Sequence, residues 1–179
     1  MLYVFGFDRV GVAVSELYFV DPRPSPGQEG AEHGVRLEVR LIQAGEAEGS
    51  IYAARPIEVG LPIWRADLLE SVEGPPASFD RTHHHPRFRG WEPGRRQFEE
   101  DMSADPVTWV GIRLSDLPGL LEGAGVDASE VSDTDAGQLR AAVPDILAAV
   151  QRLLDGVHAG ELAAAPAGAT PDSARDSWL

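Results

Sequence analysis

The sequence of 179 residues contains no cysteine, and its 15 basic residues include no lysine. Without cysteine the chain can form no disulfide, no thiolate zinc site, no iron–sulfur cluster and no thiol nucleophile. Without lysine it can form no Schiff base and cannot supply the lysine of a Walker-type phosphate loop. Aldolase-type, pyridoxal-phosphate and Walker-type chemistry are therefore excluded. Histidine, carboxylates and arginine are left as the strongest metal-binding and anion-binding groups.

Several motifs of known enzymes are also absent. The chain has no G-x-S-x-G nucleophile turn, no H-E-x-x-H metal motif and no G-x-G-x-x-G sequence after a strand pattern. No apolar run approaches the roughly 20 residues that span a bilayer, and Asp8 and Arg9 interrupt the apolar start too early for a signal peptide. We therefore expect a cytoplasmic protein without membrane association.

The charge of the chain is strongly negative, with 29 acids against 15 arginines and a formal net charge of -14. Residues 97–179 carry most of this excess, so the second half of the chain is the acidic half. Non-specific binding to nucleic acid depends on positive charge that displaces counterions from phosphates. We therefore expect no nucleic-acid partner.

One segment departs from this acidic average, and we call residues 80–98 the basic segment. Three of the five histidines of the chain, His83, His84 and His85, are consecutive in it. It also carries five arginines and, between the first and the last of them, a single acid, Glu92. The arginines are Arg81, Arg87, Arg89, Arg95 and Arg96.

The first half of the chain has the patterns of β-strands. Residues 9–20 are rich in β-branched and aromatic side chains and are followed by a proline-rich loop. Between residues 35 and 41, apolar side chains alternate with Arg36, Glu38 and Arg40, which is typical of a strand with one buried face. We expect Val35, Leu37, Val39 and Leu41 to form that face. Turns at 43–49 and 60–62 separate further strand segments at 50–55 and 63–69.

The second half has helical patterns. A short helix is expected between Pro93 and Asp101, and Ser103–Pro106 resembles a helix start because an N-cap oxygen precedes a proline. The glycine-rich residues 119–125 interrupt the helical pattern. Residues 134–157 carry a continuous apolar stripe at helical spacing, within which Pro144 is expected to kink the helix or divide it.

These patterns predict an α+β fold in which an N-terminal antiparallel β-meander of three to five strands packs against C-terminal helices. Residues 1–159 are expected to form one domain. Residues 160–179 are rich in alanine, proline and glycine, and we expect a flexible tail. Trp178 and Leu179 at its end are apolar and could dock on the body or on a neighbour.

The histidines suggest a metal site. Side chains two apart in an extended segment project to the same side, which applies to His83 and His85, and Pro86 favours an extended His85. The ion would be a divalent metal of the zinc, iron or manganese type. Asp80 is the nearest carboxylate and our choice for a third ligand, with Glu92, Glu99, His33 and Asp67 as further candidates. A histidine loop that faces solvent or a partner remains the simpler interpretation.

The arginines suggest an anion site. A guanidinium group offers planar paired donors to phosphate or carboxylate, and Trp91 lies between the arginines for stacking. We therefore expect Arg87, Arg89, Arg95, Arg96 and Trp91 to bind an anionic ligand. Alternatively, these arginines neutralise the acidic helical half of the same chain.

Two functions are consistent with this segment. One is a metal-dependent enzyme, hydrolytic in type, in which His83 and His85 bind the metal and an arginine orients an anionic substrate. The other is a non-catalytic interaction module whose basic segment contacts an acidic protein, including a second copy of this chain.

Overall fold

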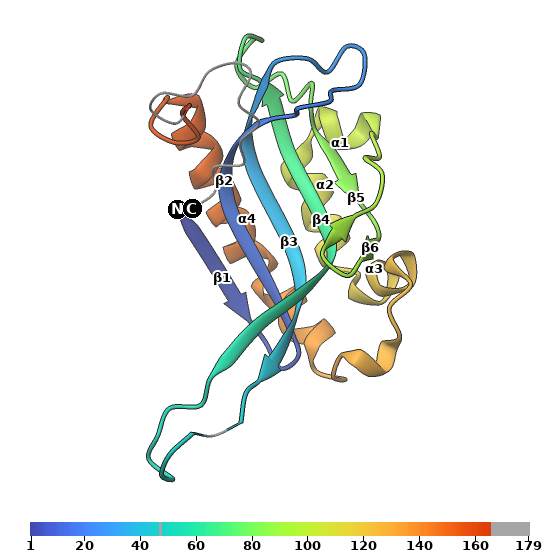
Figure 1. Ribbon diagram of the computed structural model, residues 1–179. Coiled ribbons are helices and arrows are strands. Elements are labelled where there is room, and N and C mark those ends of the chain that lie inside the picture. Colours follow the sequence, from blue (N-terminus) through green and yellow to red (C-terminus); the bar gives the residue numbers. More distant parts are fainter. Residues whose placement is uncertain (47, 166–179) are drawn as a thin grey trace.

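The computed structural model describes residues 1–46 and 48–165 and has an N-terminal antiparallel sheet followed by helices (Figure 1). The five strands lie side by side in the order of the sequence, as a meander. They are β1 (Leu2–Gly6), β2 (Val10–Val20), β3 (Ala31–Ala44), β4 (Ile57–Ser71) and β5 (His83–His85). The short strands β6 (Phe88–Arg89) and β7 (Glu92–Pro93) form a separate hairpin. The α+β prediction is confirmed.

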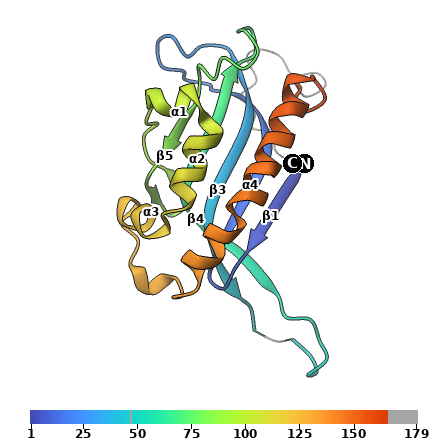
Figure 2. The ribbon, with the colours of Figure 1, turned by 180° about the vertical axis from the view of Figure 1, so that it is seen from behind.

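The helices cover one face of the sheet, as the view from behind shows (Figure 2). They are α1 (Glu100–Ala104), α2 (Pro106–Leu114), α3 (Leu117–Ala124), the 3₁₀ turn η1 (Ala128–Glu130) and α4 (Asp135–His158). Val35, Leu37 and Val39 are fully buried beneath them, and Leu41 is partly buried. The predicted interior face of this strand is therefore correct.

The opposite face of the sheet is charged. Across β3, β4 and β5, Arg36 pairs in register with Asp67 and Asp67 with His83. One step along, Glu38 pairs with Arg65 and Arg65 with His85. The rings of Phe88 and Trp91 lie 5.7 Å and 5.6 Å from the guanidinium carbons of Arg65 and Arg40.

The charged side chains of this face are less exposed to solvent than the sequence suggests. Asp67 is 1% exposed and Glu38 is 8% exposed. Burying such groups is tolerable only when each charge has a partner, and here arginines of β3 and β4 supply it.

The strand predictions need three corrections. The segment at 50–55 is not a strand but part of the loop at the tip of a long β3–β4 arm that projects from the body (Figure 1). Residues 60–62 form no turn: they lie within β4, where the register with β3 shifts around Arg40, which pairs with Pro62. A bulge of this kind accommodates a proline, which lacks the N–H of a regular ladder. Finally, β1 was not expected.

The helix predictions also need correction. The short helix begins at Glu100, later than expected. The glycine-rich segment is helical, because the Asp116 carboxylate accepts a hydrogen bond from Gly119 N at 3.1 Å and Gly125 ends α3 with a φ of 71°. α4 is one helix that continues through Pro144. The expected helix start is confirmed, with Asp105 as the N-cap of α2.

Most of the expected tail, including Trp178 and Leu179, belongs to residues 166–179 and lies outside the described residues. Among the helices of residues 1–46 and 48–165, none is long and apolar enough to cross a membrane.

Candidate functional site

The strand pairing of β4 and β5 brings together three side chains of the types that can bind a metal ion. Asp67 is the direct partner of His83 in this pairing, and His85 lies two residues further along the same face of β5. His84 projects to the opposite face, where its ring lies 6.2 Å from that of Trp64 and 5.1 Å from that of Trp109. The expectation that His83 and His85 share one side is confirmed.

The separations of these three side chains match those of metal ligands. Asp67 Oδ2 lies 3.4 Å from His83 Nε2 and 3.5 Å from His85 Nε2. One atom from each residue lies within 4.8 Å of the other two. Two ligand atoms that each lie about 2.1 Å from a tetrahedral zinc ion are about 3.4 Å apart. The two separations from Asp67 are therefore those expected between ligands of one ion.

The hydrogen bonds of the two rings determine which nitrogen of each ring carries the proton and which presents a lone pair. His83 Nδ1 lies 2.7 Å from Arg81 O, and His85 Nδ1 lies 2.7 Å from Gly94 O. A carbonyl oxygen only accepts, so both Nδ1 atoms carry the proton, and in a neutral ring Nε2 then presents its lone pair. This is the arrangement of metal-binding histidines, whose second nitrogen donates to a backbone carbonyl.

The protonation of the site favours metal binding as well. Burial lowers the pKa of His85 against the opposing effect of Asp67, so the ring is neutral near pH 7. Burial raises the pKa of Asp67, but the guanidinium groups of Arg36 and Arg65 hold it well below its usual range. An ionised carboxylate thus faces a neutral imidazole. His85 Nε2 is buried without a hydrogen-bond partner among the described residues.

A cavity of about 270 Å³ opens onto the triad. Three arginines contribute to its wall: Arg36, Arg65 and Arg96. Arg36 Nε donates to Asp67 Oδ1 at 2.7 Å, and Arg65 Nε lies 3.0 Å from Asp67 Oδ2. Arg96 lies on the loop after β7 and pairs with Glu32 at 3.1 Å.

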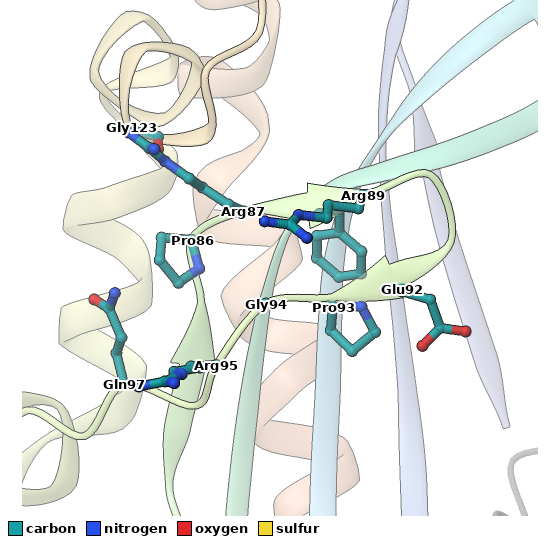
Figure 3. A pocket seen from close by; sticks show the side chains of 10 residues that line it. Pro86, Arg87, Arg89, Glu92, Pro93, Gly94, Arg95, Gln97 and Gly123 are labelled. Carbon is teal, nitrogen blue, oxygen red and sulfur yellow. The ribbon is translucent and has the colours of Figure 1, made fainter.

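A second, larger cavity of about 900 Å³ lies along the β6–β7 hairpin, and we call it the arginine groove (Figure 3). Arg87, Arg89 and Arg95 line it, with Glu92 as its acid. Arg87 reaches across to α3, where its Nε donates to Gly123 O at 2.8 Å. Arg89 and Arg95 are exposed, and their side chains form no hydrogen bond or ion pair with the described part of the chain.

The residues expected to form one site are divided between these two cavities. Arg87, Arg89 and Arg95 share the groove, whereas Arg96 lines the cavity of the triad. Trp91 lies over Arg40 and is 62% exposed. Within residues 1–46 and 48–165, no arginine of the basic segment pairs with an acid of the helices; Arg96 instead pairs with acids that precede β4.

Asp80 does not join the triad. Its Oδ1 accepts hydrogen bonds from Ser71 N at 2.8 Å and from Ser78 Oγ at 2.9 Å, so it orders the loop between β4 and β5. Asp67 of β4 occupies the third position instead. Glu92 lines the arginine groove.

Glu99 and His33 also lie apart from the triad, each in a histidine–carboxylate contact of its own. Glu99 Oε1 lies 3.0 Å from His84 Nε2, on the helix side of the sheet. His33 faces Glu70 at 3.4 Å, and Glu70 also lies 3.3 Å from His158 of α4. Glu70 was not predicted from the sequence. Neither the pattern of its strand nor that of the helix with His158 indicates that these two side chains are in contact. All five histidines of the chain lie against a carboxylate.

Comparison of the chain with protein-family models, with curated proteins and with solved structures finds no match. The function is therefore argued from the geometry of the site.

Proposed function

We propose that Asp67, His83 and His85 bind one divalent transition-metal ion of the zinc, iron or manganese type. The observation that supports this most strongly is the direction of the lone pairs. Both Nδ1 atoms donate to carbonyl groups, so the Nε2 atom of neutral His85 and the ionised Asp67 face each other as two acceptors at 3.5 Å. A cation between them converts this unfavourable contact into two coordination bonds.

The ligand set supports a hydrolytic metal centre rather than a structural one. Structural zinc sites are closed by four protein ligands, whereas three ligands leave a position for water. A metal ion lowers the pKa of such a water toward neutrality and makes it a nucleophile. The cavity of about 270 Å³ beside the triad gives a small substrate room to approach that position.

Elemental analysis tests the metal site. We expect untagged protein to retain up to about one equivalent of a divalent metal, and the double variant His83→Ala, His85→Ala to lose it. His84→Ala is the matched control, because His84 lies on the same strand but faces the helices. Metal binding should weaken as the pH falls through the histidine range, since protonated imidazole does not bind metal.

Two results would contradict the proposal. One is wild-type protein that contains no metal and is not stabilised by added Zn²⁺, Fe²⁺ or Mn²⁺. The other is a double variant that folds and retains the metal, which would move the ion to another cluster, such as Glu70 with His33 and His158.

A second proposed function is anion binding in the arginine groove. The supporting observation is that Arg89 and Arg95 line a cavity of about 900 Å³ while lacking partners in the described part of the chain. Guanidinium groups with free donors bind phosphate or carboxylate in a paired geometry. The groove would then hold an anionic ligand or an acidic segment of a partner protein.

Titration with inorganic phosphate and with a poly-glutamate peptide tests the groove. We expect both to bind more weakly as salt is raised, and the double variant Arg89→Gln, Arg95→Gln to lose this binding. Arg23→Gln, an exposed arginine of the β2–β3 loop, serves as control. Equal binding by the wild type and the double variant would exclude the groove.

A further inference from the structure

The ion pairs around the triad form a network of arginines and carboxylates. Within the described residues, Arg36 and Arg65 pair with Asp67, Arg65 and Arg40 pair with Glu38, and Arg96 pairs with Glu32 and Asp21. Among these described pairs, four carboxylates face four arginines.

A divalent ion at the triad would add two positive charges to this network. Asp67 and Glu38 are nearly fully buried, so charges here are weakly screened by water. An excess charge in such a site costs free energy unless a counter-charge enters with it. The described carboxylates of the network are already engaged by arginines, so an anionic ligand would supply that counter-charge.

The wall of the triad cavity offers donors for such a ligand. Arg96 is the most exposed of its three arginines, with 22% of its side chain accessible against 12% for Arg36 and 13% for Arg65. Only Nη1 of Arg96 donates hydrogen bonds to described residues, namely to Glu32 and Gln28. Its Nη2 lies 3.7 Å from a carboxylate that follows β2, which is too long for a hydrogen bond. The Nε and Nη2 hydrogens therefore remain available for an anion.

From these observations we propose that the site binds its metal ion together with a small oxyanion, a phosphate or a carboxylate, and that each strengthens the binding of the other. One oxygen of the anion would bind the metal and another the guanidinium group of Arg96. The cavity of about 270 Å³ limits the anion to a small molecule. This inference rests on the proposed metal site and names the class of ligand that it accepts.

Calorimetric titration of metal-free wild-type protein with Zn²⁺ tests the inference. The titration is run in chloride buffer alone, with acetate added and with inorganic phosphate added. We expect the anion that fits to tighten Zn²⁺ binding by about 30-fold, the middle of the usual range for coupled ligands. The same anion should bind more tightly by the same factor when Zn²⁺ is present. The acetate and phosphate titrations distinguish a carboxylate from a phosphate.

The outcomes separate this inference from the metal site itself. If Zn²⁺ binds with the same affinity in all three buffers, the metal site stands and the anion partnership is wrong. If Zn²⁺ binds in none of them, and Fe²⁺ and Mn²⁺ titrated in the same buffers do not bind either, the metal site itself is wrong.

The variant Arg96→Gln tests whether the guanidinium group of Arg96 binds the oxyanion. We expect this variant to keep the Zn²⁺ affinity measured in chloride and to lose the increase produced by the oxyanion, whereas Arg96→Lys should keep part of the increase because it retains the charge. Arg23→Gln, on the exposed β2–β3 loop, is the control and should retain the full increase. An increase that survives Arg96→Gln would contradict the assignment to this cavity. Thermal unfolding shows whether each variant is folded, and the wild-type comparison decides the proposal by itself if Arg96→Gln does not fold.

Discussion

Asp135 is a fully buried carboxylate that ties the start of α4 to the β1–β2 turn. Its Oδ1 accepts hydrogen bonds from Asp8 N and Arg9 N, each at 3.1 Å, and its Oδ2 accepts one from Ser132 N at 2.7 Å. The position of α4 over the sheet therefore depends on one side chain at this end of the helix.

We expect Asp135→Ala to destabilise the protein by about 3 kcal/mol, because it leaves three backbone N–H groups without their charged acceptor. Urea unfolding of the two proteins measures this difference. Asp133→Ala, two residues earlier and exposed, is the control and should change stability by less than about 0.5 kcal/mol. Equal stability of Asp135→Ala and the wild type would mean that water replaces the carboxylate without cost.

At the same scale, the sequence predicted only part of the candidate site. The spacing of His83 and His85 was sufficient to place them on one face, because alternation in a strand is a local property. The third member of the triad was not predictable in this way. Asp67 meets His83 through the β4–β5 register, which depends on how the intervening loop closes, whereas Asp80 was favoured only because it is near in sequence.

Among the elements, α4 provides the largest apolar surface over the sheet and packs against β2 and β3. Ile146 lies in the middle of its buried stripe and is 0% exposed. We expect Ile146→Ala to cost about 3 kcal/mol of stability, since it removes a buried side chain and leaves a cavity. Thermal or urea unfolding measures the loss.

Ile112→Ala is the matched control for this substitution. Ile112 is on α2 but is 67% exposed, so its truncation should change stability by no more than about 0.5 kcal/mol. If both variants lost the same stability, the packing of α4 on the sheet would be described incorrectly.

The sequence predicted those elements that are defined by a repeated pattern, and it missed those that depend on a single residue. The alternation between residues 35 and 41 and the stripe of α4 are repeated many times, so they outweigh local exceptions such as Pro144. The bulge at Arg40 and Pro62 and the helix at Leu117–Ala124 depend instead on single residues, namely a proline opposite a strand and a capping aspartate. The tip at 50–55 has strand-like residues but no neighbouring strand to pair with.

The whole molecule carries a large negative charge, and several of its carboxylates stabilise the folded chain only while ionised. Hydrogen bonds from Thr108 lower the pKa of Asp105, and hydrogen bonds from Ser129 lower that of Asp127. Burial raises the pKa of Asp80, but hydrogen bonds from Ser71 and Ser78 lower it further than burial raises it. In each case the folded chain holds the proton less readily than the unfolded chain.

Because these pKa values are lower in the folded state, their contribution to stability is present above about pH 3.9, the unfolded value, and is lost as pH falls through the folded values. We expect the free energy of unfolding to drop in this acid range. The triple variant Asp80→Asn, Asp105→Asn, Asp127→Asn should be less stable than the wild type at pH 7, and the difference should shrink near pH 3. Urea unfolding at both pH values measures it, and a difference that widens in acid would contradict the assignment.

The sequential order of the strands places the triad at the border between a long strand and the edge of the sheet. Asp67 belongs to β4, which is paired on both sides, whereas β5 has only three residues and carries both histidines. β5 is held by this pairing and by the bridge between His84 and Gln97. Its detachment would leave β1 to β4 intact, since edge segments open at a lower free energy than the core. The lifetime of a bound ion would then be set by the opening rate of this short strand, and ion exchange would be faster than global unfolding.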